Sequence, residues 1–329
     1  MAGRGRIDFD MTPGPNSTVP HRGFGATDAM LVLMAIIWGV NYTVVKAGLE
    51  YLQPLAFNGA RMGLATIVLF IIAPFMARGV PWPNARGRRQ LLTIGVVGNG
   101  VYQLLFILGM QYTRAGVAAL ILAAAPAWVA IIARMMGREQ ISQSAWTGIA
   151  LQLLGVVFVV GSAFGMESSG KSLYGALLMA LGSMCWALYT VLAQPHTLRA
   201  HPLHLSALTM LSGAVLVIAA ALPGLRHANL SAVPFSAWSA VLYSSLGAIV
   251  IGYLLYYRGV RVLGPTRASM YGNLQPVVAL IVAWAALHEH PTAVQWLGAA
   301  LILGGLLLSR NSRGSLIARI NREPVARSA

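Results

Sequence analysis

Residues 102–158 read YQLLFILGMQYTRAGVAALILAAAPAWVAIIARMMGREQISQSAWTGIALQLLGVVF, and residues 252–308 repeat the pattern 150 positions later without a gap. Matches among apolar residues mean little in a chain rich in Leu, Ala and Val. The matches at other residue types mean more: Gly109 with Gly259, Pro126 with Pro276, Glu139 with Glu289, Trp146 with Trp296, Gly148 with Gly298 and Gly155 with Gly305. Their shared register indicates an internal duplication.

The chain around this duplication is strongly apolar. Of its 329 residues, 57% are hydrophobic and only 9% are charged, whereas soluble domains carry about 25% charged residues. Most apolar runs approach about 20 residues, the length that spans a bilayer as a helix. The sequence predicts an all-α integral membrane protein with ten transmembrane helices, at roughly residues 29–48, 55–76, 90–111, 115–134, 144–162, 173–193, 203–222, 237–257, 266–287 and 292–309.

The basic residues predict the orientation of these spans. The net charge is +15, but most of the 23 Lys and Arg residues lie in alternate connections and in the tails, which indicates a membrane rather than nucleic acid as partner. By the positive-inside rule, both termini are cytoplasmic. Each half then holds an odd number of spans, so the two halves enter the membrane from opposite sides. The sequence thus predicts an inverted repeat, which many secondary transporters build around a substrate site near the midplane.

Several motifs occur in order along both halves. The first span reads IIWGVNYTVVKAGL at 36–49, the second carries Asn58-Gly59-Ala60-Arg61, and the repeated unit contains the polar breaks GREQIS and HEHPT. In these motifs the chain resembles the EamA family of the drug/metabolite transporter superfamily. The resemblance implies ten helices in two inverted five-helix repeats, a bacterial inner-membrane location, and export or uptake of small metabolites, with amino acids as common substrates. We divide the chain into a disordered cytoplasmic tail (1–27), two EamA-like repeats (28–162 and 173–309) and a basic cytoplasmic tail (310–329).

Polar and aromatic side chains inside several spans predict a cavity. On the third span, Asn99, Tyr102 and Gln103 are spaced i, i+3, i+4 and share one helix face. Polar groups in hydrocarbon are costly unless they meet a partner helix or a wet cavity. We favour the cavity because Tyr253 lies on nearly the same face of the eighth span. Similar faces, for which packing is an equally good interpretation, occur on the first and sixth spans at Trp38, Asn41, Tyr42, Trp186 and Tyr189.

Two prolines interrupt the repeated unit at matching positions. The ninth span carries Tyr271, Asn273 and Gln275 just before Pro276, and Pro126 takes the same place in the fourth span. Proline removes a helical hydrogen bond and frees a carbonyl, which inside a membrane needs protein or water as its partner. We predict bends at both prolines beside the substrate path. Kinks that only improve packing are the alternative.

Few charged residues accompany the spans. Arg61 could pair with a substrate carboxylate through its forked donors, but a structural role in holding helices together is favoured. Lys46 is expected to snorkel toward the membrane surface. Glu139 and Glu289 are expected to cap helix ends rather than to carry protons.

Missing motifs narrow the function further. No acidic residue lies mid-span, and the chain lacks a GxxxxGK[ST] phosphate loop, an HExxH motif and a Cys/His cluster. The sequence therefore favours facilitated diffusion or exchange, or coupling by an unusual route, over ATP-driven pumping and over catalysis, with no cofactor and no metal.

The predicted function is secondary transport of small organic metabolites, most of all amino acids. Transport would proceed by alternating access of two repeats around an aromatic and amide-lined cavity. Alternatives are a multidrug exporter of the same fold, or a membrane scaffold or enzyme without transport. The expected partners are the substrate and the bilayer, without nucleic acid. The oligomeric state is left open, a monomer included.

Overall fold

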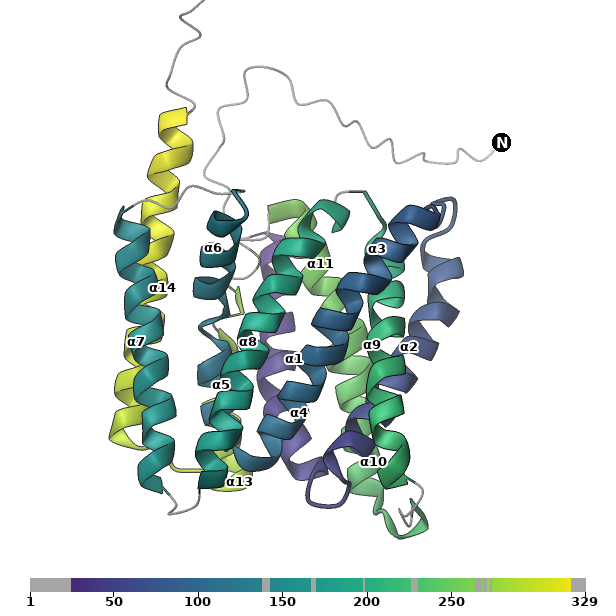
Figure 1. Ribbon diagram of the computed structural model, residues 1–329, viewed down its shortest axis with the longest axis horizontal. Helices are drawn as coiled ribbons and strands as arrows, with labels where there is room; N and C mark the ends of the chain where they lie inside the picture. Colours follow the sequence, from purple (N-terminus) through teal and green to yellow (C-terminus); the bar gives the residue numbers. More distant parts are fainter. Residues whose placement is uncertain are drawn as a thin grey trace, which may run out of the picture.

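The computed structural model describes residues 25–137, 143–166, 170–197, 199–225, 230–263, 268, 271–272 and 274–320. Within these ranges the chain is almost entirely helical and contains no strand. The helices form one bundle in which most axes run along a common direction, as Figure 1 shows.

Seven stretches of helix are long and apolar enough to cross a membrane. They are α1 (Ala26–Gly48), α2 (Pro54–Met76), α3–η1–α4 (Ala85–Gly95, Val96–Val101 and Tyr102–Tyr112), α5–α6 (Ala115–Leu122 and Ala125–Met135), α8 (Gly170–Thr197), α9 (Pro202–Leu225) and α10–η3–α11 (Phe235–Leu242, Tyr243–Ile251 and Gly252–Leu263). Three helices have shorter apolar stretches among the described residues: α7 (Gln143–Met166), α13 (Leu274–Leu287) and α14 (Ala293–Ile320). A single 3₁₀ turn, η2 (Leu230–Ala232), precedes α10.

The outer surface of the bundle is apolar. Ile67 and Ile71 of α2, Val215 of α9 and Ile281 of α13 each expose more than half of their surface. A water-soluble bundle of this size would place such side chains inside. Together with the seven long apolar helices, this surface defines an all-α membrane protein.

Local sequence explains where several helices begin and end. Pro54 occupies the first turn of α2, where its missing N–H is not needed. The Asn84 side chain caps α3 by accepting the N–H of Gly87 at 2.8 Å. Gly137 follows α6 with a φ of 68°, a left-handed conformation that suits glycine. At the other end of the chain, α14 continues through Ile320, into the segment for which the sequence predicts a tail.

Helix interruptions recur at equivalent places in the two halves. The third and eighth spans each contain a π-helical segment, and these segments end at Val101 and Ile251, 150 positions apart. In the fourth span α5 ends at Leu122 and α6 begins at Ala125, just before Pro126. The helix is therefore interrupted next to the first of the two prolines, where the sequence predicts a bend. The described part of the ninth span begins with α13 at Leu274, close to Pro276.

Contacts between the halves also come in matched pairs. Helices α7 and α14 lie side by side (Figure 1), with Gly155 against Gly298 and Gly148 against Gly305. Their residue numbers run in opposite directions along the contact, so these two helices are antiparallel. A Cβ added at Gly155 would lie 2.7 Å from the carbonyl oxygen of Gly298, which shows how closely the backbones approach.

Equivalent glycines of the two halves also make helix contacts elsewhere in the bundle. Gly109 of α4 lies against Met179 of α8, and Gly259 of α11 lies against Leu31 of α1. Helix α1 packs on α11 and α13, and α8 packs on α4 and α6, while α2 packs on α9. These contacts place α1, α4, α8 and α11 around the centre of the bundle.

Candidate functional site

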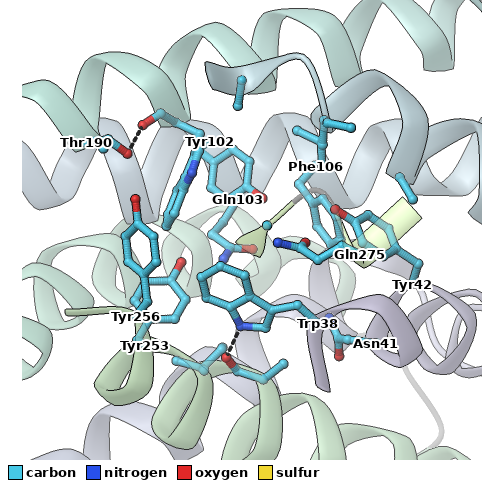
Figure 2. A pocket seen from close by; sticks show the side chains of 18 of the residues that line it. Trp38, Asn41, Tyr42, Tyr102, Gln103, Phe106, Thr190, Tyr253, Tyr256 and Gln275 are labelled. Atoms are coloured by element: carbon cyan, nitrogen blue, oxygen red, sulfur yellow. Dashed lines mark hydrogen bonds between the residues drawn. The ribbon is translucent and has the colours of Figure 1, made fainter. Parts of the chain in front are cut away.

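A cavity of about 110 Å³ lies at the centre of the bundle. Its wall is drawn from α1, α2, α4, α5, α6, α8, η3, α11 and α13. Ten residues that the sequence singles out line it: Trp38, Asn41, Tyr42, Arg61, Tyr102, Gln103, Pro126, Trp186, Tyr253 and Gln275. Figure 2 shows most of these side chains converging from different helices.

One side of the cavity is aromatic. The Trp38 ring centre lies 6.1 Å from that of Trp186 and 5.7 Å from that of Tyr253. Tyr256 lies 5.5 Å from Trp38 and 5.9 Å from Trp186, and Tyr102 lies 5.3 Å from Trp186. Tilted and edge-on rings at these spacings attract one another beyond the area they bury. The cluster therefore forms an aromatic wall on which a flat or apolar group can stack.

The indole of Trp38 is fixed by a hydrogen bond. Its Nε1 donates to the carbonyl oxygen of Ala248 at 2.7 Å, the bond drawn beside Trp38 in Figure 2. The ring passes directly over Gly252, where any Cβ would collide with it. Glycine at this position, at the junction of η3 and α11, thus allows the ring to reach the cavity.

The cavity wall also holds a buried charge. Arg61 of α2 is only 2% exposed. Its Nε donates to Asn58 Oδ1 at 2.7 Å, and its Nη2 donates to Gln103 Oε1 at 2.5 Å. The guanidinium carbon lies 5.3 Å from the centre of the Phe106 ring, within cation–π range. Because Asn58 Nδ2 also donates to the backbone carbonyl of Gln103 at 3.0 Å, the network ties α2 to α4.

Amide side chains complete the wall. Asn41 of α1 accepts a hydrogen bond from the Ser244 hydroxyl of η3 at 2.7 Å, across the two halves of the chain. Gln275 of α13 extends into the cavity between Trp38 and Tyr42 in Figure 2. The site thus offers stacking surface, amide donors and acceptors, and one guanidinium.

Two of the predicted site residues are buried away from the cavity. Asn99 lies in the π-helical segment η1, fully buried against Gly213 of α9. A π turn holds more residues than an α turn, so the spacing that places Asn99 on the face of Tyr102 in a regular helix no longer does so. Tyr189 is also fully buried, and its hydroxyl bonds to that of Tyr257 and lies 3.4 Å from Thr209 Oγ1.

The remaining predicted positions belong to the ninth span. The Tyr271 hydroxyl donates to Asp28 Oδ1 at the start of α1 rather than facing the cavity. Pro276 is buried in the first turn of α13 and does not line the cavity. Asn273 lies outside the described residues.

The sequence does not single out the small and apolar residues that complete the cavity wall. They are Ala119, Leu122, Ala123, Ala125, Val129, Ala248, Ile249 and Gly272. In an apolar chain nothing marks such residues. Thr190 is different, because it lies one turn beyond Trp186 and that spacing is visible in the sequence. Its hydroxyl donates to the Trp186 carbonyl at 2.9 Å, the bond drawn in Figure 2.

Charged side chains at the ends of the bundle bind helix termini. Glu289 accepts the N–H groups of Ala115 at 3.0 Å and Gly116 at 3.2 Å, so it caps the N-terminus of α5. This confirms the capping role predicted for Glu289, whereas Glu139 lies outside the described residues. Snorkelling of Lys46 stays a prediction. Its Nζ donates to three carbonyls at the end of α4, those of Met110 and Thr113 at 2.9 Å and that of Gln111 at 3.3 Å.

The apolar surface, the bundle of membrane-length helices and the central cavity define a polytopic α-helical membrane protein. Comparison with known protein families then identifies the family to which the chain belongs. Residues 26–161 and 173–310 each match the EamA-like transporter family, so the chain belongs to that family.

Relatives agree with this assignment. The chain is 30% identical over 282 residues to the uncharacterized transporter YyaM of Bacillus subtilis (strain 168), covering 84% of this chain and 91% of that one. It is also 30% identical over 290 residues to the uncharacterized inner membrane transporter YedA of Escherichia coli (strain K12), covering 87% and 89%. Both are named transporters, which places the chain among transporters rather than enzymes. A solved crystal structure shares the fold, with a TM-score of 0.61 at 20% identity over 89% of this chain and 98% of that one.

Proposed function

We propose that the protein is a secondary transporter of small organic metabolites, with amino acids as the foremost substrate class. The observation that carries the proposal is the central cavity, because both halves of the chain build its wall. Trp38, Arg61 and Gln103 come from the first half, and Trp186, Tyr253 and Gln275 come from the second. A site shared in this way changes its access when the halves move relative to each other.

The proposal includes an architecture of ten helices in two inverted five-helix repeats, at 28–162 and 173–309. Two family matches in one chain and the antiparallel pairing of α7 with α14 support it. In addition, α1 begins and α14 ends at the same end of the bundle (Figure 1). With the distribution of basic residues, this supports cytoplasmic termini in a bacterial inner membrane. The name of the inner membrane transporter YedA agrees with that location.

The cavity wall supports a small, partly apolar and overall neutral solute. A volume of about 110 Å³ accommodates several waters, each of which needs roughly 10–15 Å³, or one small organic molecule in their place. The rings of Trp38, Trp186 and Tyr253 suit an apolar or aromatic side chain, whereas Asn41 and Gln275 suit polar groups. Because the aromatic side carries no charge, amphipathic drugs are the second candidate class of cargo.

Contacts at opposite ends of the bundle support alternating access. At one end Tyr271 bonds to Asp28, and at the other Glu289 caps α5. Each contact joins one half of the chain to the other. Rocking of the halves would open one contact while the other stays closed. No carboxylate lines the cavity among the described residues, which favours facilitated diffusion or exchange over coupling through a buried acid.

Flux in proteoliposomes tests the proposal. The purified protein is reconstituted and supplied with a panel of labelled amino acids, with and without an imposed pH gradient. Tyr102→Ala removes a ring from the cavity wall and is expected to lower flux at unchanged membrane expression. Tyr174→Ala is the matched control, because Tyr174 is 53% exposed on the outside of α8.

The outcomes separate the alternatives. Uptake of one group of amino acids, independent of the gradient and sensitive to Tyr102→Ala alone, would support a facilitator with this cavity as its path. Uptake only under a gradient would refute the uncoupled mechanism. Uptake of amphipathic cations but of no amino acid would move the assignment to drug export, and no flux of either kind would contradict the transport proposal.

A further inference from the structure

The charge of Arg61 has no ionic partner within the described protein. Moving a charge into a low-dielectric interior is costly unless an opposite charge or a full set of hydrogen bonds compensates it. Arg61 is nearly fully buried inside a membrane span, and its two hydrogen-bond acceptors, Asn58 and Gln103, are both neutral amides. These bonds use only two of the five N–H groups that a guanidinium carries.

The acidic residues are otherwise engaged or distant. The chain has eight Asp and Glu residues, and the structure describes three of them. Asp28 accepts a bond from Tyr271, Glu289 caps α5, and Glu50 is exposed in the turn after α1. The other five lie in the sequence outside the apolar spans: Asp8, Asp10, Glu139, Glu167 and Glu323.

A purely structural role does not require this charge. The second half supplies an internal comparison, because its helix α9 begins at Pro202 as α2 begins at Pro54, 148 positions earlier. In that register the buried residue Thr209 takes the place of Arg61. The first half therefore keeps a costly charge where the second half has a neutral side chain, and that charge faces the cavity.

We propose that Arg61 is the receptor for a carboxylate on the transported molecule, so that the cavity selects small monocarboxylates, α-amino acids among them. This inference rests on the proposed function. A planar guanidinium binds a carboxylate through two parallel hydrogen bonds, and the anion would neutralise the buried charge. Gln103, already bonded to Arg61, orients the guanidinium from α4.

Other residues of the wall can bind the rest of such a molecule. Phe106 is the ring beside Arg61, and in Figure 2 Phe106 and Tyr42 lie at one side while Tyr253 and Tyr256 lie at the other. These rings offer stacking surface to an apolar or aromatic side chain. Gln275 also lines the cavity, and its amide oxygen can accept a hydrogen bond from an amino group.

Ligand pairs that differ only in the carboxylate test the inference without requiring transport. Thermal stabilisation of the detergent-purified protein is titrated with phenylalanine against phenylalaninamide, and with leucine against leucinamide. We expect the acids to bind about tenfold or more tightly than their amides, the range of a charge-assisted pair. Equal binding of acid and amide, or no binding of either acid, by the wild-type protein would overturn the inference.

Variants separate recognition from stability. Arg61→Gln is expected to bind acid and amide within about threefold of each other, because the charge-assisted pair is gone. Arg61→Lys keeps the charge without the fork and is expected to retain a reduced preference for the acid, so it also serves if Arg61→Gln does not fold. Asn58→Ala removes a support of Arg61 but no charge, so it is expected to lower the melting temperature while keeping the preference.

The two proposals fail in different ways. An acid preference that persists in Arg61→Gln would overturn the role of Arg61. Acid-selective binding that Arg61→Gln abolishes, without uptake in proteoliposomes, would uphold the carboxylate site and contradict transport. Uptake of amides and acids at equal rates would uphold transport and overturn the carboxylate site.

Discussion

The contact between α7 and α14 predicts opposite outcomes for two adjacent substitutions. Gly305 faces α7, where an added Cβ would lie 2.5 Å from the carbonyl oxygen of Gly148 and 2.8 Å from the backbone nitrogen of Gln152. An added Cβ at Gly304 would meet nothing within 4 Å. Alanine therefore creates a clash at one position and fills open space at the next.

The expected magnitudes follow from these distances. Carbon atoms attract best at about 3.5–4.0 Å, so alanine at Gly305 must push the two backbones apart by roughly 1 Å. Overpacking costs about 1–3 kcal/mol, and the upper end applies because backbone atoms cannot rotate away. Replacing glycine within a helix returns about 1 kcal/mol. We expect Gly305→Ala to lower the free energy of unfolding by about 2 kcal/mol, and Gly304→Ala to raise it by about 1 kcal/mol.

Thermal unfolding in detergent, followed by circular dichroism, measures the difference. A gap of about 3 kcal/mol between the two variants corresponds to roughly 6 °C in melting temperature for a chain of this size. Both variants are heated at one scan rate, so that any irreversible step affects both melting temperatures equally. Gly155→Ala and Gly161→Ala repeat the comparison on α7, since only Gly155 meets the partner helix.

If Gly305→Ala unfolds at or above the temperature of Gly304→Ala, the two helices do not approach at this glycine. The antiparallel pairing that supports the inverted repeat would then lose its main contact.

Three further predictions concern other contacts. Gly98→Ala places a methyl group on the ring of Tyr189, so the yield of monodisperse protein in size-exclusion chromatography should collapse and should recover in part when Tyr189→Ala is added; an undiminished yield would contradict the contact. Lys46→Met removes three bonds to carbonyls at the end of α4 and should lower the free energy of unfolding by about 1–3 kcal/mol, whereas an unchanged melting temperature would show that these bonds contribute nothing. Glu289→Gln keeps the shape of the α5 cap but not its charge, and should lower stability by about 0.3–1 kcal/mol, with Glu289→Ala lower still; equal losses would show that the charge alone matters.

The sequence predicts the face of each span better than the partner of each side chain. Tyr102, Gln103 and Trp186 reach the cavity because polar and aromatic residues within an apolar span have few places to lie. Tyr189 instead meets Tyr257, 68 positions away. Local spacing carries no information about a partner on a helix so distant in the chain.

Irregular backbone limits the prediction in a second way. Asn99 leaves the predicted face because η1 is π-helical, and the short motif Val-Val-Gly-Asn-Gly-Val does not reveal that geometry. The sequence does not show that Lys46 Nζ donates to carbonyls at the end of α4, because that contact depends on how α1 packs on α4. Glu289 is predictable because a carboxylate beside a helix start has one favourable use.

The placement of the tryptophans gives the protein an optical readout of its own. Two of the eight, Trp38 and Trp186, stand in the cavity wall. Four others are 36–57% exposed on the outer surface: Trp146, Trp238, Trp284 and Trp296. Indole emission shifts with the polarity of its surroundings, so a molecule that displaces water from the cavity changes the light from the inner pair while the outer four report only on lipid or detergent. Replacing the outer four, together with Trp82 and Trp128, with phenylalanine would leave an unlabelled chain whose fluorescence follows occupancy of the cavity in real time.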